Sequence, residues 1–148
     1  MLIEILRIEN FDKILSLLQE YKKVINEKSI DDKQADKIKN AILNGSIIIY
    51  TILEGDEIIG MCSISTIFST YRCETIGVFD DFFIKPEYRK KGYARELVNF
   101  VLSDMKAKKI NSIMLGCSDI DKEMYKSLGF NMEIGNLLSW DGESKTSS

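Results

Sequence analysis

One stretch of the sequence, residues 75–105, combines a strand, a short basic turn and a helix, and it limits the fold more than any other feature. Residues 75–84 are rich in β-branched and aromatic side chains, which is typical of a buried strand. After the turn, apolar side chains recur at helical spacing, namely Ala94, Leu97, Val98, Val101, Leu102 and Met105. A further apolar run at 111–117 completes a strand-helix-strand unit. Such a unit predicts two parallel neighbouring strands joined by a right-handed crossover, and therefore an α/β (α+β) fold.

The turn before the helix carries a glycine within a cluster of positive charge. The cationic side chains around Gly92 are Arg89, Lys90, Lys91 and Arg95. The first backbone N–H groups of a helix have no partner within it, and the helix dipole favours negative charge there. Gly92 lets a ligand approach the main chain, and Ala94 keeps the next turn small. The turn therefore predicts a phosphate-binding site at the start of the helix.

Two common phosphate motifs do not fit this turn. A Walker loop needs a longer glycine loop that ends in Gly-Lys-Ser/Thr, and the dinucleotide fingerprint needs an earlier glycine and a downstream acidic residue. The order Arg89-x-x-Gly92-x-Ala94 instead resembles the acyl-coenzyme A pyrophosphate loop of the GCN5-related N-acetyltransferases (GNAT family). Residues 80–84 and 124–130 resemble the flanking motifs of that family, in the same order and at similar spacing.

The resemblance implies acetyl-CoA as co-substrate and no metal. It places the pyrophosphate on the basic turn and the pantetheine arm between the two diverging parallel strands, along the first of them. The residues expected to bind acetyl-CoA are Phe82, Phe83, Ile84, Arg89, Lys90, Lys91, Gly92, Tyr93, Ala94, Arg95 and Ser118. Ser118 stands where the family often has asparagine.

The resemblance also implies which residues perform the chemistry. Tyr125 takes the position of the family's general acid, which protonates the leaving sulfur. Asp80 takes the position of an acidic residue that binds or deprotonates the amine in polyamine-acetylating relatives, with aspartate in place of glutamate. Because neighbouring strand residues point to opposite faces, only one of Asp80 and Asp81 is expected to face a given cleft. Both are candidate substrate-binding residues, and Tyr71 in the preceding loop is a third.

The chain contains no histidine, so a general base must be another group or a positioned water. Cys117, at the end of the last predicted strand, lies near the expected thioester, and an acetyl-cysteine intermediate is conceivable. Without a histidine to activate it, a buried, unreactive thiol is the favoured interpretation. Asp121 is interpreted as a charge at the start of a helix.

Composition narrows the class of protein. The 148 residues carry a net charge of −3, which argues against a general nucleic-acid binder. Three features predict a cytoplasmic, bacterial-type protein with no signal peptide and no membrane partner. They are the three cysteines, an N-terminus that alternates like a strand, and the lack of a long apolar run. A small-molecule amine is the expected partner, and a homodimer is also considered.

The remaining pattern predicts a single domain at residues 1–140 and a polar tail at 141–148. Strands are expected at 2–8, 46–53, 57–66, 75–84 and 111–117, with one or two more within 130–140. Helices are expected after Asn10, after a loop at 26–33, after Gly92, and at 121–128, where Gly129 ends the last one. Residues 67–74 are expected to form a loop. The resemblance implies a mixed, mostly antiparallel sheet with a splayed parallel pair and flanking helices.

The leading hypothesis is an acetyl-CoA-dependent N-acetyltransferase that transfers the acetyl group directly to a primary amine, with a weak preference for polyamine-like acceptors. The alternatives are a non-catalytic acyl-CoA sensor or regulatory subunit and a protein N-terminal acetyltransferase. Kinship of fold does not identify the acceptor.

Overall fold

The computed structural model describes residues 1–143, so the predicted polar tail lies outside the described residues from 144 onward. The described chain divides into two compact units: Met1–Leu115, and a second that begins at Gly116. Among the described residues, no helix is long and apolar enough to cross a bilayer.

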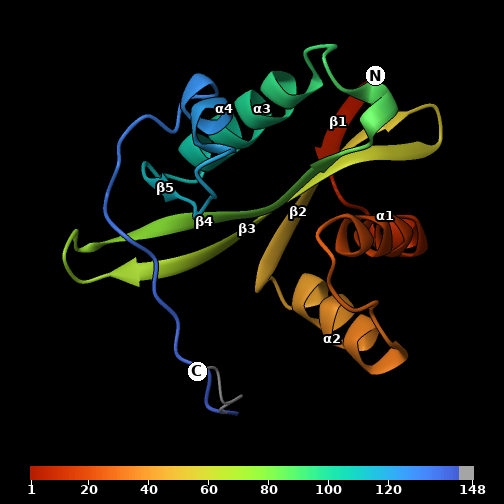
Figure 1. Ribbon diagram of the computed structural model, residues 1–148, viewed down its shortest axis with the longest axis horizontal. Coiled ribbons are helices and arrows are strands. Elements are labelled where there is room, and N and C mark those ends of the chain that lie inside the picture. The colour runs from red at the N-terminus through yellow and green to blue at the C-terminus, as the bar shows by residue number, and fades with distance from the viewer. Residues whose placement is uncertain (144–148) are drawn as a thin grey trace. The chain divides into compact units, whose positions relative to one another are not determined.

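A five-stranded sheet in the order β1-β2-β3-β4-β5 organises the first unit (Figure 1). Its strands are β1 (Leu2–Ile5), β2 (Ile47–Glu54), β3 (Glu57–Ser69), β4 (Glu74–Ile84) and β5 (Ile113–Met114). The first four pair antiparallel in sequence order, and β5 pairs parallel to β4. The predicted mixed sheet with one parallel pair is confirmed.

Three α-helices cover this sheet: α1 (Phe11–Val24), α2 (Asp32–Leu43) and α3 (Tyr93–Ala107). Short 3-10 turns precede two of them, η1 (Ile8–Asn10) and η2 (Pro86–Tyr88), and the second unit contains α4 (Lys122–Ser127). Asn10 precedes α1 as expected, although its side chain does not cap the helix. The start of α2 is fixed by a capping box between Asp31 and Gln34.

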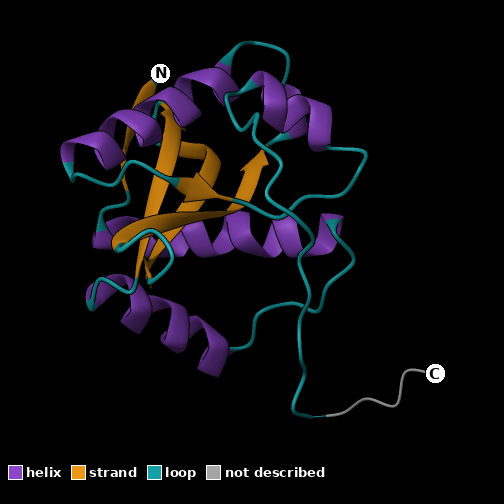
Figure 2. Cartoon of the chain, turned by 90° about the vertical axis from the view of Figure 1, so that its left-hand side faces the viewer, coloured by secondary structure: helices purple, strands orange, loops and turns teal. Residues whose placement is uncertain are grey.

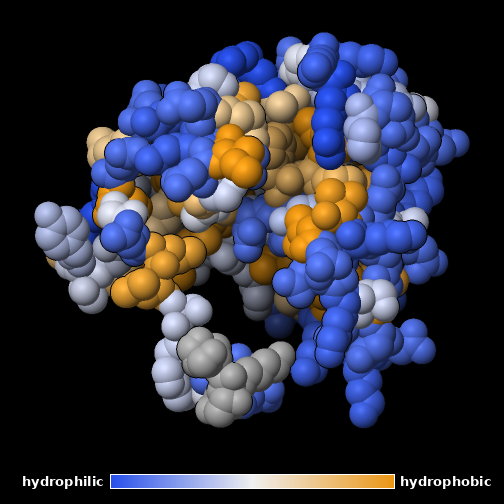
Figure 3. Space-filling model, viewed as in Figure 1, coloured by the Kyte–Doolittle hydropathy of each residue, from blue (hydrophilic) through white to orange (hydrophobic). Residues whose placement is uncertain are grey.

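The core lies on both faces of the sheet. On one face, Ile49 and Leu53 of β2 pack with Phe11 and Ile14 of α1. Alternation turns Tyr50 of β2 to the opposite face, where α3 buries its apolar stripe, namely Leu97, Val98, Val101 and Met105. Figure 2 shows the sheet between α3 on one side and α1 and α2 on the other, and Figure 3 shows hydrophilic side chains over the outward surfaces of α1 and α2.

The hairpin between β3 and β4 is longer than the sequence predicted. Residues 67–74 were expected to be a loop, but Phe68 pairs with Thr75 and Ser69 pairs with Glu74. Only residues 70–73 connect the two strands. The sequence pattern was misleading because Phe68 is followed by serine and threonine, which are common in loops. The Phe68 side chain is exposed, so the strand has no buried position there to mark it.

Three predicted strands are wrong or too long. The first ends at Ile5 instead of Ile8, and the fifth is two residues long because its parallel pairing with β4 reaches only Gly77 and Val78. Residues 130–140, all of them described, form no strand. Their large apolar side chains, Met132, Ile134, Leu137, Leu138 and Trp140, are exposed. Without partner backbone or burial, nothing offsets the entropy of ordering an extended chain.

Candidate functional site

The turn that joins β4 to α3 has the backbone geometry of an open anion site. Gly92, at the N-cap of α3, has a φ of 84°, and Lys90 has a φ of 61°. A Cβ added to Gly92 would meet no heavy atom within 4 Å, so packing does not explain the glycine. Its positive φ does, and the space beside the first amides of α3 is free for a ligand.

Arg89 folds back onto the end of β4. Its Nε donates a 2.8 Å hydrogen bond to the carbonyl oxygen of Ile84, and its guanidinium carbon lies 5.5 Å from the ring centroid of Phe83. Arg89 thereby holds the turn against the strand that precedes it. The neighbouring Lys90, Lys91, Gly92 and Arg95 are exposed, and the Lys91 ammonium lies 5.5 Å from the Tyr88 ring.

The first helical residue of α3, Tyr93, is held by a hydrogen bond to β2. The Tyr93 hydroxyl donates a 2.6 Å hydrogen bond to a carboxylate oxygen of Glu54, the last residue of β2. Tyr93 and Ala94 are half-buried. The helix start is therefore fixed to both β4, through Arg89, and β2, through Glu54. Nothing in the sequence marked Glu54 for this contact, because it depends on how the strands are arranged.

Beyond Val78, no described strand pairs with the edge of β4 that faces β5. This edge includes Phe82, Phe83 and Ile84, where the pantetheine arm was expected. Phe83 and Ile84 are buried and Phe82 is half-buried. A strand edge with no neighbouring strand leaves room for an extended ligand to lie along it.

A β-bulge interrupts β4 at the two acidic residues. Met61 pairs with Phe83 and Ser63 with Asp80, so one residue of β3 lies opposite two of β4. Asp81 sits in the bulge with a φ of 55°. The expectation that only one of Asp80 and Asp81 faces a given cleft assumed a regular strand, and the bulge interrupts the regular alternation at these two residues.

The bulge gives the two carboxylates different surroundings. The Asp81 carboxylate accepts a 2.9 Å hydrogen bond from the Ser63 hydroxyl, and the Asp80 carboxylate accepts a 2.8 Å bond from the Asp81 amide. Asp80 is exposed, whereas Asp81 is half-buried. Burial raises the pKa of Asp81, the negative charge of Asp80 raises it further, and Ser63 and Lys22 oppose the shift.

Helix α1 places Tyr21 near the two carboxylates. Burial raises the pKa of Tyr21, and the charges of Asp81 and Asp80 add to the effect. The ring centroid of Tyr21 lies 5.5 Å from that of Phe83. The sequence analysis did not find Tyr21, Lys22 or Ser63. Two adjacent aspartates inside an apolar strand were a signal for a group of polar residues here, since a regular strand would have to bury one of the two carboxylates.

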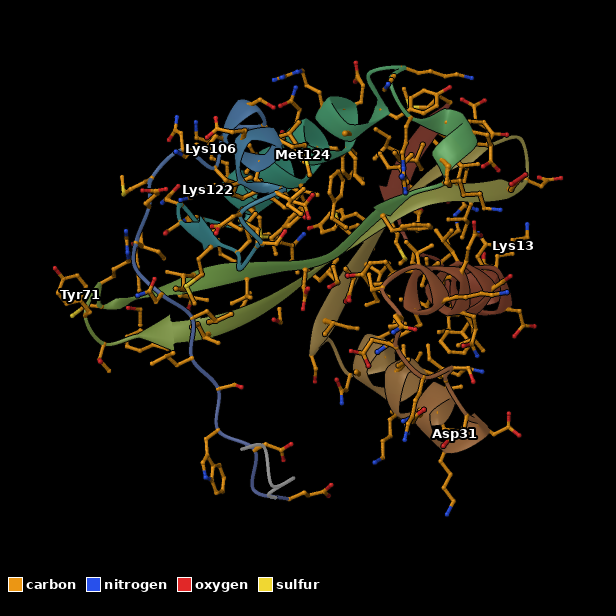
Figure 4. The ribbon with its side chains drawn as sticks, viewed as in Figure 1. Lys13, Asp31, Tyr71, Lys106, Lys122 and Met124 are labelled. Atoms are coloured by element: carbon orange, nitrogen blue, oxygen red, sulfur yellow. The ribbon has the colours of Figure 1, made fainter. Side chains whose placement is uncertain are left out.

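Tyr71 lies apart from these groups, whereas Cys62 of β3 lies opposite the bulge. Tyr71 is 95% exposed at the tip of the β3–β4 hairpin, where its side chain points to solvent (Figure 4). Burial raises the pKa of Cys62, which therefore stays a protonated thiol at neutral pH.

The second unit contains the remaining candidates, Tyr125, Ser118 and Cys117. Tyr125 in α4 is half-buried, with its ring edge-on to Phe130 at 6.2 Å. The Ser118 hydroxyl donates a 3.2 Å hydrogen bond to Asp121, whose side chain does not cap α4. Cys117 is exposed, contrary to the expected buried thiol.

The sequence matches the model of the acetyltransferase (GNAT) family over residues 11–130. The chain therefore belongs to the GNAT family, whose members are acyltransferases that use acetyl-CoA. No curated protein sequence matches it.

Solved structures show the same fold at low identity. A predicted acetyltransferase from Clostridium acetobutylicum, solved with acetyl-CoA, has a TM-score of 0.81 and 17% identity over 99% of both chains. Glucosamine-6-phosphate N-acetyltransferase from Arabidopsis thaliana has a TM-score of 0.75 and 21% identity over 95% of this chain and 96% of its own. An aminoglycoside acetyltransferase from an uncultured soil metagenomic sample has a TM-score of 0.82 and 13% identity over 95% and 94%.

Proposed function

We propose that this chain is an N-acetyltransferase that transfers the acetyl group of acetyl-CoA to a primary amine of a small cationic molecule. The open, glycine-containing turn at the start of α3, directly after a stretch of β4 with no described strand beside it, carries this proposal. A phosphate-binding turn at the end of such a strand edge suits a ligand with a pyrophosphate and an amide-bearing arm.

The residues around the turn fit acetyl-CoA. The amides at the start of α3, together with Lys90, Lys91 and Arg95, would hold the pyrophosphate. Arg89 and Tyr93 would keep the turn in place, since both side chains bond to the strands behind it. Bound acetyl-CoA supplies a thioester, which is an activated acyl donor.

The chemistry at the amine requires the loss of two protons overall. A carboxylate of the Asp80–Asp81 pair accepts the first from the ammonium, which frees the nitrogen lone pair to form the new N–C bond. As the C–S bond breaks, the Tyr125 hydroxyl donates its proton to the leaving sulfur, and the second amine proton passes through water to the Tyr125 oxygen and restores the hydroxyl. The proton held by the carboxylate is released to solvent. The amide and a free thiol result, with no acyl-enzyme at Cys117.

The acceptor class follows from charge. Two adjacent carboxylates with one nearby lysine leave an excess of negative charge, which favours an acceptor with one or more ammonium groups. A polyamine or an amino sugar has this character, and the solved relatives include acetyltransferases named for aminoglycosides and glucosamine-6-phosphate. The cytoplasmic location and the homodimer stay predictions.

Release of free thiol from acetyl-CoA, measured with a panel of polyamines, amino sugars, amino acids and peptides with free N-termini, tests this function. We expect turnover with at least one polyamine or amino sugar. Turnover with peptides alone would favour a protein N-terminal acetyltransferase. Calorimetric binding of acetyl-CoA without turnover on any amine would favour an acyl-CoA sensor and overturn the proposal.

A further inference from the structure

We propose that Ser63 of β3 is a positioning residue that holds the Asp81 carboxylate toward the acceptor amine, so that Asp81, and not Asp80, takes the proton. This inference rests on the proposed function and assigns roles within its acceptor site.

The bulge is the first support for this assignment. It gives Asp81 a φ of 55°, so the side chain leaves the regular alternation of β4. Bulges commonly redirect a side chain next to an active site. Ser63 is itself 6% exposed, and its hydroxyl lies 2.9 Å from the Asp81 carboxylate and 3.3 Å from the Asp80 carbonyl oxygen. The carboxylate is the nearer and stronger acceptor.

The hydrogen bonds differ between the two carboxylates in a way that suits different tasks. An Asp80 oxygen accepts the Asp81 amide, so Asp80 helps to fix the bulge backbone. Ser63 donates its hydrogen bond to one oxygen of Asp81, Oδ2, which restrains that side chain. Asp81 is half-buried and Asp80 is exposed, so a proton is held more readily on Asp81.

The charged and titratable groups that face Asp81 come from three elements. Asp80 of β4 and burial disfavour its charged form, while Ser63 of β3 and Lys22 of α1 favour it. Tyr21 of α1 and the Cys62 thiol of β3 stay neutral near pH 7, since burial raises the pKa of both. Burial is the largest influence on the pKa of Asp81, and among the neighbouring side chains Asp80 raises it while Ser63 and Lys22 lower it.

Because Ser63 and Asp80 have opposite effects on the pKa of Asp81, variants of these two residues should shift the pH dependence of the reaction in opposite directions. The pH dependence of kcat/KM for the acceptor amine is measured for wild type, Ser63→Ala, Asp80→Asn and Asp81→Asn. We expect Ser63→Ala to move the rising limb to higher pH and Asp80→Asn to move it to lower pH. Asp81→Asn should remove the limb and lower kcat/KM by about 10²-fold. The control is Ser65→Ala, two residues along β3, which should leave the limb unchanged.

A measurement that needs no turnover separates this inference from the proposed function. Carboxyl carbon NMR of the ¹³C-labelled free protein follows the Asp81 titration directly, and the same two opposite shifts are expected. If no amine is acetylated, the proposed function fails while the NMR result still decides the role of Ser63. An unmoved Asp81 titration in Ser63→Ala, or loss of the limb in Asp80→Asn alone, would overturn the inference.

Discussion

Asp81 carries its charge at a place where burial disfavours it, so its contribution to stability depends on pH. Because its pKa is raised in the folded protein, Asp81 contributes stability below the ordinary carboxyl range, and this stability is lost as the pH rises through the raised pKa. Above the raised pKa the folded state therefore holds an unfavourable charge. Such a cost is typical of residues kept for function.

Asp81→Asn should therefore raise the free energy of unfolding at pH 7 while it lowers activity. Asparagine is almost isosteric and accepts a positive φ well, so the bulge can persist. Urea denaturation at pH 7 and at about pH 3, where carboxyl groups are largely protonated, measures the effect. The advantage of the variant should disappear at the lower pH. Equal stability of the two proteins at pH 7 would contradict this account of Asp81.

Tyr125 can be tested without loss of its packing. Tyr125→Phe keeps the ring that lies edge-on to Phe130 and removes only the hydroxyl. If that hydroxyl protonates the leaving sulfur, kcat should fall by about 10²-fold, because the interaction matters only as the C–S bond breaks. Acetyl-CoA affinity, measured by calorimetry, should change little. An unaltered kcat would assign protonation of the sulfur to water.

At the scale of elements, Gly92 in the turn between β4 and α3 has a matched control in Gly45, which follows α2. Gly92→Asp would place bulk and negative charge beside the first amides of α3, and we expect it to weaken acetyl-CoA binding at least tenfold, or about 1.4 kcal/mol. Gly45, at the end of α2, also has a positive φ and an open surrounding, so Gly45→Asp imposes comparable backbone strain. Calorimetry should show wild-type affinity for Gly45→Asp. Similar affinities for both variants would refute the proposed location.

The same turn shows what the sequence could predict. Its glycine, its cations and the flanking periodic segments lie close together in the chain, so β4, the turn and α3 were predicted from local signals. The bulge at Asp81 was not, because it depends on the register between β3 and β4. Ser63 and Tyr21 were missed for the same reason, since they reach Asp81 from other elements. The predicted strand at 130–140 was wrong because an apolar pattern does not provide a pairing partner.

Across the first unit as a whole, a partly buried polar contact joins the sheet to the far end of α3. Tyr50 of β2 is fully buried, and its hydroxyl donates a hydrogen bond to Asp104, which also pairs with Lys108. Burial acts to raise the pKa of Asp104, but the bonds from Lys108 and Tyr50 outweigh it, so the pKa is lowered. The helix that begins at the proposed pyrophosphate site is thus fastened at both ends.

Asp104→Asn should lower the free energy of unfolding at neutral pH by about 1 kcal/mol, a typical net value for such bonds at a partly exposed site. For a protein of this size that corresponds to a fall in Tm of about 2–4 °C. Because the pKa of Asp104 is lowered by folding, its stabilisation is present above the ordinary carboxyl pKa and is lost as the pH falls through the lowered value. The difference between variant and wild type should therefore shrink in acid. Tyr50→Phe, which leaves the Lys108 pair intact, should lose stability with a weaker dependence on pH. A deficit for Asp104→Asn that is equal at pH 7 and at about pH 2 would show that the carboxylate charge does not contribute.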